Sequence, residues 1–264
     1  MDSWHQIRNN NLSVQNIKNV FKCFCGKHPL PDFPPYESKH APEKERNNVL
    51  VSGVARSGST VAWQVVNFLS NERVLKSHGF SDSCPTMFRF DHVIVTVRHP
   101  FDAFYSKSRR EKRPNTEKDI EMFIQMWNDV GAFLLLNNLQ GSTGYRPDMK
   151  ITFLKYEDFW NKDRDRILHL SGIIDRKINN KELDEILSKT SLDQNIELSK
   201  VGQSTVEENK GRNTITPRIH ASHVGERRGK PGQGVQLDKE TKDKILKNLE
   251  WVFEEFGYEK NGEI

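Results

Sequence analysis

The segment from Val49 to Val66 constrains the fold of this chain more than any other. A β-branched apolar run leads into a glycine-bearing turn, and the turn leads into the start of a helix. In this arrangement the N–H groups of the turn and the helix N-terminus face one anion, and Arg56 adds a positive charge beside them. The segment therefore predicts a phosphate-binding loop, in which Ser57, Ser59 and Thr60 contribute hydroxyl donors.

The loop departs from that of ordinary nucleotide hydrolases. Gly53 and Gly58 are spaced as in G-x-x-x-x-G-K-[ST], but Ser59 stands at the lysine position. The cation lies three residues earlier, at Arg56. This shift argues against an ATP or GTP hydrolase.

Length and composition set broad limits on the fold and on partners. The chain has 264 residues and a net charge of +4, which suits one large domain and fits an anionic small ligand as well as nucleic acid. The longest strongly apolar run, 132–136, is too short to span a bilayer, and residues 1–9 lack the apolar core of a signal peptide. We expect a cytoplasmic protein that binds neither membrane nor nucleic acid, as a monomer or homodimer.

The cysteines do not indicate a disulfide framework or a metal centre. There are three, at positions 23, 25 and 84, and an odd number fits a reducing compartment. Cys23, Cys25 and His28 have ligand-like spacing, but no fourth ligand follows at a finger-like distance. We therefore expect no bound metal.

The order of elements predicts an α/β fold. We expect a loop-rich extension over 1–47, and a single three-layer domain over 48–264 with a central parallel sheet and helices on both faces. Such a sheet presents its active residues at the C-terminal ends of its strands. Besides the strand that begins near residue 48, strands are expected at 73–76, 92–98 and 150–155, and helices after Pro100 and at 116–138, 164–172, 181–200 and 239–256, with a charged loop over 202–236.

Two clusters follow strands of this sheet. His78 could act as a general base and Lys76 could neutralise charge on a transferring group, although an isolated histidine is more often a surface residue. Arg98 ends the third strand, and Ser106 lies eight residues later on the next helix. Arg98 suits a second phosphate site, or alternatively a helix-capping salt bridge.

Two further clusters lie later in the chain. Tyr156 follows the fourth strand within Lys155-Tyr-Glu-Asp-Phe159, which could also be a simple helix start. Arg227, Arg228 and Gly229 lie in the late loop, where they could close over a phosphate or form a solvated charge run.

Together these residues resemble the sulfotransferases that use 3′-phosphoadenosine 5′-phosphosulfate (PAPS). Arg56-Ser-Gly-Ser-Thr60 resembles the family's 5′-phosphosulfate loop, and Arg98 with Ser106 resembles its 3′-phosphate motif. Lys76-Ser-His78 is similar to the K-T-H segment of the cytosolic members, and Tyr156-Glu-Asp158 to the Y-E-D segment. The stretch 227–232 resembles the late loop that closes on the 3′-phosphate. Order and spacing agree from about 48 to 257.

The resemblance implies an activity and roles for these residues. PAPS would be the cofactor, and the sulfuryl group would pass in line to a hydroxyl or amine of a small-molecule acceptor. His78 would be the catalytic base. Lys76 and Arg56 would neutralise charge, while Ser106 would restrain Arg56 until the acceptor binds. The cofactor-binding residues would be Arg56, Ser57, Gly58, Ser59, Thr60, Arg98, Ser106, Tyr156, Arg227, Arg228 and Gly229.

Two departures from the family pattern bear on the site. Val61 stands where the cytosolic members place a tryptophan that stacks on adenine. Trp63 lies two helix positions further, roughly 200° around the axis, and cannot simply replace it. Gln233 and Gly234 stand where the cytosolic late loop continues D-W.

Two other classes of protein remain open on the residues alone. A small-molecule kinase would share the strand, loop and helix, but should have a lysine at position 59 and a magnesium-binding carboxylate after a later strand. A non-catalytic nucleotide-binding protein of the same fold is the second alternative, against which Lys76 and His78 argue.

Overall fold

The computed structural model describes residues 49–70, 74–77, 90–111, 115–143, 149–191, 193–195, 197 and 229–262. The extension predicted over 1–47 lies outside these residues, as do all three cysteines, His28, and most of the loop predicted over 202–236.

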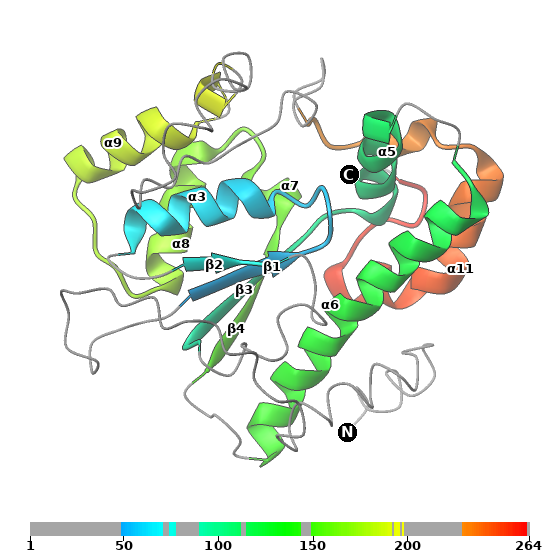
Figure 1. Cartoon of the computed structure of the whole chain (residues 1–264), viewed down its shortest axis with the longest axis horizontal. Coiled ribbons are helices and arrows are strands. Elements are labelled where there is room, and N and C mark those ends of the chain that lie inside the picture. The colour runs from blue at the N-terminus through cyan, green and yellow to red at the C-terminus, as the bar shows by residue number, and fades with distance from the viewer. Residues whose placement is uncertain are drawn as a thin grey trace, which may run out of the picture.

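The core of the protein is a parallel four-stranded sheet (Figure 1). Its order is β2 (Val74–Lys76), β1 (Val49–Gly53), β3 (His92–Val97) and β4 (Lys150–Lys155). β1 and β3 are buried along their whole length. A strand covered on both faces has a near-continuous apolar sequence, and this pattern predicted both strands. The predicted α/β fold is confirmed.

One face of the sheet is covered by α3 (Ser59–Leu69), α8 (Asp163–Ile173) and α9 (Asn180–Thr190), as Figure 1 shows. Side chains that alternate along the strands point into this layer, where they pack on the helices. This cluster includes Val49, Val51, Ile94 and Leu154 from the strands, and Val65, Leu69, Ile167, Leu170, Leu183 and Ile186 from the helices.

The opposite face packs on α5 (Pro100–Glu111), α6 (Glu117–Thr143) and α11 (Lys239–Phe256). Predicted helix boundaries here are correct within a few residues, except that α6 continues five positions past 138. The apolar stripe of α11 is also confirmed. The cluster includes Leu50, Val93, Val95 and Val97 from the strands, and Phe104, Phe123, Trp127, Ile245, Leu249, Val252 and Phe253 from the helices.

The helix predicted over 181–200 is interrupted. α9 ends at Thr190, because Ser191 takes an extended conformation with φ −60° and ψ 156°. Helical residues resume at 193–195, where the Ser191 hydroxyl accepts a hydrogen bond from Gln194 N. The break brings buried Asn195 against α3, where its side-chain amide exchanges two hydrogen bonds, of 3.0 and 3.1 Å, with that of Gln64.

Among the described residues, no helix combines the length and the apolar character needed to cross a bilayer.

Residues 257–262 close the fold beside the C-terminal end of β3. His99 is buried, its Nδ1 accepts a hydrogen bond from Phe101 N, and its Nε2 lies 3.0 Å from the carbonyl oxygen of Glu259. Only a neutral ring with the proton on Nε2 satisfies both contacts. The ring packs within 5.2–5.4 Å of the ring centroids of Phe101, Phe253 and Tyr258.

Burial lowers the pKa of His99 below its ordinary value, so acid should weaken the fold here. Between the folded-state and unfolded-state pKa values the unfolded chain binds more protons. The stability contribution is therefore complete above pH of about 6.5 and is lost as the pH falls below it. We expect the free energy of unfolding, measured with urea, to fall between pH 7 and 5, and to fall less in His99→Gln.

His92, whose pKa burial also lowers, stays in place in this variant and should leave a residual slope. Equal slopes in the two proteins would contradict the assignment of the acid sensitivity to His99.

Candidate functional site

The loop between β1 and α3 leaves a helix N-terminus open to an anion. Gly58 is the N-cap residue of α3, with a φ of 83° that favours glycine, and no side chain among the described residues caps the helix. The first N–H groups of a helix have no partner within it. The N-terminus of α3 therefore has N–H donors and the positive end of its dipole available, which is the geometry that the predicted phosphate-binding loop requires.

Ser57 shapes this loop from within. Its N–H and its hydroxyl lie 3.2 and 2.6 Å from the carbonyl oxygen of Val54, and its Oγ lies 2.6 Å from the Thr96 hydroxyl on β3. The side chain is buried. This differs from the expectation that Ser57 donates to an anion, because both of its donors already meet Val54. The donors left for an anion come from Gly58, Ser59 and Thr60.

Arg56 is fixed at both its backbone and its side chain. It takes a left-handed conformation, with φ 73°, which is uncommon for a non-glycine residue. Its Nε donates to Ser106 Oγ on α5 at 3.0 Å, and its carbonyl oxygen accepts a hydrogen bond from Arg98. The structure thus brings together three of the residues that the sequence placed at the site.

Lys76 brings a second cation to the loop from the neighbouring strand β2. Its Nζ donates to Thr60 Oγ1 at 2.7 Å, at the start of α3. Burial lowers the pKa of this ammonium group, since a charge is less favourable away from water. His78 follows two residues later and lies outside the described residues.

Arg98 lies directly after β3 and is almost fully buried, with 3% of its surface exposed. Its Nη1 donates to the carbonyl oxygen of Arg56 at 3.3 Å, and its Nη2 donates to that of Gly229 at 3.0 Å. Asp102 lies one helical turn later, 3.6 Å from Nη2. The salt bridge, one of the two predictions for this residue, is present, and the side chain lies beside the phosphate loop. Its use as a second phosphate site stays a prediction.

Tyr156 connects the phosphate loop to the late loop. The Arg98 guanidinium lies 4.3 Å from the centre of its ring, and its hydroxyl donates to the carbonyl oxygen of Gly229 at 3.0 Å. A side chain at Gly58 would place Cβ 2.8 Å from the ring, and one at Gly229 would place it 2.4 Å from the hydroxyl. Glycine is therefore required on both sides of Tyr156.

The described part of the late loop is held by Asp102. The carboxylate accepts hydrogen bonds from the backbone N–H groups of Gly232 at 2.7 Å and Gly234 at 2.6 Å. Gln233, which departs from the family pattern, donates from its side chain to Lys230 O. The loop is thus fastened beside Arg98 by contacts that Gln233 and Gly234 themselves provide. Arg227 and Arg228 lie outside the described residues.

A pocket lies beside the phosphate loop, between α3, the end of β4 and the start of α8. Sequence analysis missed it, since its walls come from segments far apart in the chain. Trp63 is absent from its walls and donates its indole N–H to the carbonyl oxygen of Val74 at 3.2 Å. The pocket is lined by Ser57, Gly58, Val61, Ala62, Thr96, Leu154, Lys155, Tyr156, Phe159, Trp160, Asn161, Asp163 and Arg166.

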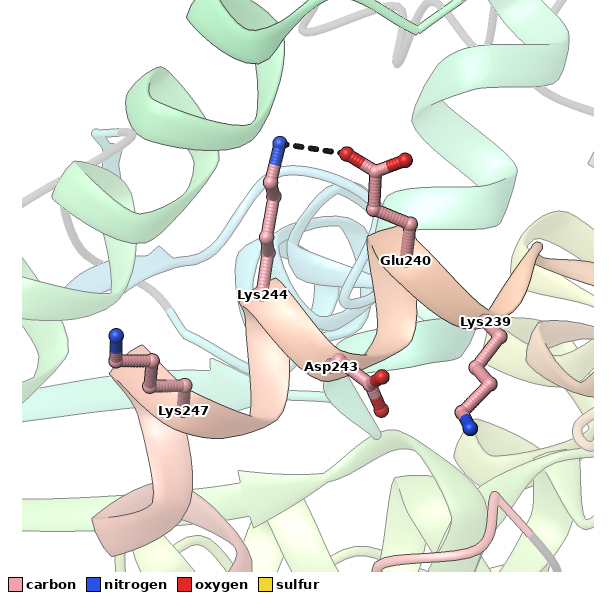
Figure 2. Close-up of a pocket in the computed structure, with 5 residues that line it drawn as sticks. All are labelled: Lys239, Glu240, Asp243, Lys244 and Lys247. Atoms are coloured by element: carbon pink, nitrogen blue, oxygen red, sulfur yellow. Dashed lines mark ion pairs between the residues drawn. The ribbon is translucent and has the colours of Figure 1, made fainter.

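An open depression on α11 has a different character, which Figure 2 shows. Its five residues all come from one helix, and Lys244 pairs with Glu240 at 3.0 Å. Alternating charges on one exposed helix face are typical of a solvated surface. The depression is lined by Lys239, Glu240, Asp243, Lys244 and Lys247.

Comparisons with known proteins identify the family of the domain and proteins of similar fold. The sulfotransferase domain family model matches residues 59–245. The fold is similar to that of mouse sulfotransferase SULT7A1, solved in complex with PAP, at a TM-score of 0.52 and 14% identity over 79% of this chain and 84% of that one. It is also similar to retinol dehydratase, solved with retinol and PAP, at a TM-score of 0.50 and 14% identity over 91% and 86%.

In sequence, no curated protein matches the chain. The domain match nevertheless covers more than half of its length and spans the open α3 N-terminus, Arg98, Tyr156 and the described late loop. The chain belongs to the sulfotransferase family.

Proposed function

We propose that this protein transfers a sulfuryl group from PAPS to a hydroxyl or amine of a small-molecule acceptor by in-line displacement. The observation that carries the proposal is the meeting of Arg56, Arg98 and Ser106 beside the uncapped N-terminus of α3. Their contacts put two arginines next to a helix that has no other capping group among the described residues. Such a site favours a ligand with more than one anionic group.

The residues present fit PAPS, which supplies an activated sulfuryl group and carries a second phosphate on its ribose. The α3 N-terminus, Arg56 and Lys76 would hold its 5′ end. Arg98 and Ser106, together with Arg227 and Arg228, would hold the 3′-phosphate. PAP is present in the mouse sulfotransferase of similar fold, which supports this assignment.

The chemistry falls to three side chains. Arg56 and Lys76 would neutralise negative charge that develops around the sulfuryl group, and their positions beside Ser106 and Thr60 limit where those charges lie. His78 would accept the proton of the acceptor, acting as the general base. Arg56 keeps its proton, because a guanidinium does not dissociate in proteins, so it acts by charge alone.

One contact favours this function over a small-molecule kinase. In a Walker loop the serine or threonine hydroxyl coordinates Mg²⁺, whereas here the corresponding hydroxyl of Thr60 accepts a hydrogen bond from the Lys76 ammonium. The Lys76 ammonium group thus binds the Thr60 hydroxyl, which a kinase would use to coordinate its metal ion. Arg98 also stands after β3, where a kinase would place a carboxylate.

Ligand binding and turnover test the proposed function. We expect PAP to raise the thermal unfolding temperature, because a ligand that binds only the folded state stabilises it, and we expect ATP with Mg²⁺ to raise it less. Labelled sulfate from PAPS should then appear in a small molecule when the protein is incubated with an extract of its source organism. Stabilisation by ATP with Mg²⁺ but not by PAP would favour the kinase. PAP binding without transfer to any acceptor would favour a non-catalytic protein.

Replacing His78 tests the proposed base. His78→Ala should lower turnover by roughly 10²- to 10⁴-fold, the usual contribution of a general base, while leaving the affinity for PAP nearly unchanged. Turnover should be measured at saturating acceptor and the affinity by calorimetry. An unchanged rate would remove His78 from the mechanism.

Replacing Ser106 tests the restraint on Arg56. Ser106→Ala removes the acceptor of the Arg56 Nε–H hydrogen bond, so we expect PAP affinity to fall roughly 2- to 10-fold and PAPS hydrolysis without acceptor to rise. Ser108→Ala is a matched control on the same helix, because the Ser108 hydroxyl donates to the helix backbone at Phe104 and has no hydrogen bond to Arg56 or Arg98 among the described residues. Equal behaviour of the two variants would show that Ser106 does not restrain Arg56.

A further inference from the structure

The pocket beside the phosphate loop is continuous with the proposed PAPS site. Ser57 and Gly58 belong to both the loop and the pocket wall, and the Tyr156 ring that packs on Gly58 lines the pocket as well. A ligand whose phosphate lies at the α3 N-terminus would therefore have its next group at the mouth of this pocket.

The walls of the pocket suit a flat, largely apolar group. Val61 and Ala62 from α3 form one side, and Phe159 and Trp160 come from the segment after β4. The Phe159 side chain packs against the core cluster that includes α3 and α8. The centre of its ring lies 4.9 Å from that of exposed His169. Trp160 is half-buried and ends the short helix α7 (Tyr156–Phe159). The lining thus combines large aromatic rings with small aliphatic side chains, and an aromatic face favours contact with a planar ring.

Polar groups line the rest of the pocket. Asn161, Asp163 and Arg166 supply both donors and acceptors. Arg166 pairs with Asp163, while its buried Nε–H has no acceptor among the described residues. An apolar slot with a few polar groups is the usual form of a site that orients a small ligand.

We propose that this pocket takes the nucleobase of the nucleotide, and that Trp160 supplies the aromatic face on which the base stacks. The inference rests on the proposed function. In this chain Val61 leaves α3 without an aromatic ring at the pocket, and Trp63 is committed to Val74 on β2. Trp160 therefore provides from the β4 side the stacking surface that α3 lacks here.

Binding of two ligands to Trp160 variants tests the inference. One ligand is PAP, and the other is 1-deoxyribofuranose 3,5-bisphosphate, which keeps the sugar and both phosphates but lacks the base. Trp160→Ala should weaken PAP binding roughly 5- to 100-fold, the range found for removal of a base-stacking aromatic side chain. The abasic ligand should bind both proteins alike, and Trp160→Phe should recover most of the lost PAP affinity.

Tryptophan fluorescence gives a second measurement. PAP should quench part of the wild-type emission, and this change should be lost in Trp160→Phe but kept in Trp251→Phe, since Trp251 packs in the core cluster on the other face of the sheet.

The outcomes separate the two proposals. Equal loss of affinity for both ligands in Trp160→Ala, or no loss for either, would overturn the stacking role while leaving PAPS binding intact. Failure of the wild-type protein to bind PAP would instead overturn the proposed function, and the stacking role with it.

Discussion

The site depends on the packing of Tyr156 between two glycines. The ring contacts Gly58 of the phosphate loop on one side, while its hydroxyl meets Gly229 of the late loop and the Arg98 guanidinium lies over its face. Three segments that are far apart in the sequence are thereby set at fixed distances. A tyrosine tolerates this burial because its neutral hydroxyl donates to the carbonyl oxygen of Gly229, and burial raises the pKa of that hydroxyl further above neutral pH.

Arg98 shows how the fold prepares a cation for an anionic ligand. Burying a guanidinium is costly unless its donors are satisfied. Here the backbone carbonyl oxygens of Arg56 and Gly229 and the carboxylate of Asp102 meet the two Nη groups, whereas the buried Nε has no hydrogen-bond partner among the described residues. The same partners fix its position beside the phosphate loop. Much of the free-energy cost of ordering and desolvating this side chain thus arises when the protein folds. Less of that cost then remains when a ligand binds.

The sequence predicted those features that local patterns encode. The buried runs of β1 and β3 and the stripe of α11 follow from period and burial, and the loop from Val54 to Gly58 follows from its glycine and its place between strand and helix. The pairing of Asn195 with Gln64, 131 positions earlier, could not be predicted, because it joins two elements that only the folded chain brings together. The double role of Ser57 and the aromatic pocket at Trp160 likewise depend on neighbours that only the folded chain provides.

The contact between Arg98 and Gly229 also bears on the order of folding. It joins residues 131 positions apart, whereas β1, α3 and β2 form a local unit within residues 49–76. Closing a long loop costs more chain entropy than pairing neighbouring elements, so long-range contacts tend to form late. The strand–loop–helix unit should accordingly be able to form while the late loop is still apart from Arg98. A partly folded chain of that kind would have an anion-binding helix end but no assembled nucleotide site. The nucleotide would then bind only those molecules in which the late loop has joined Arg98.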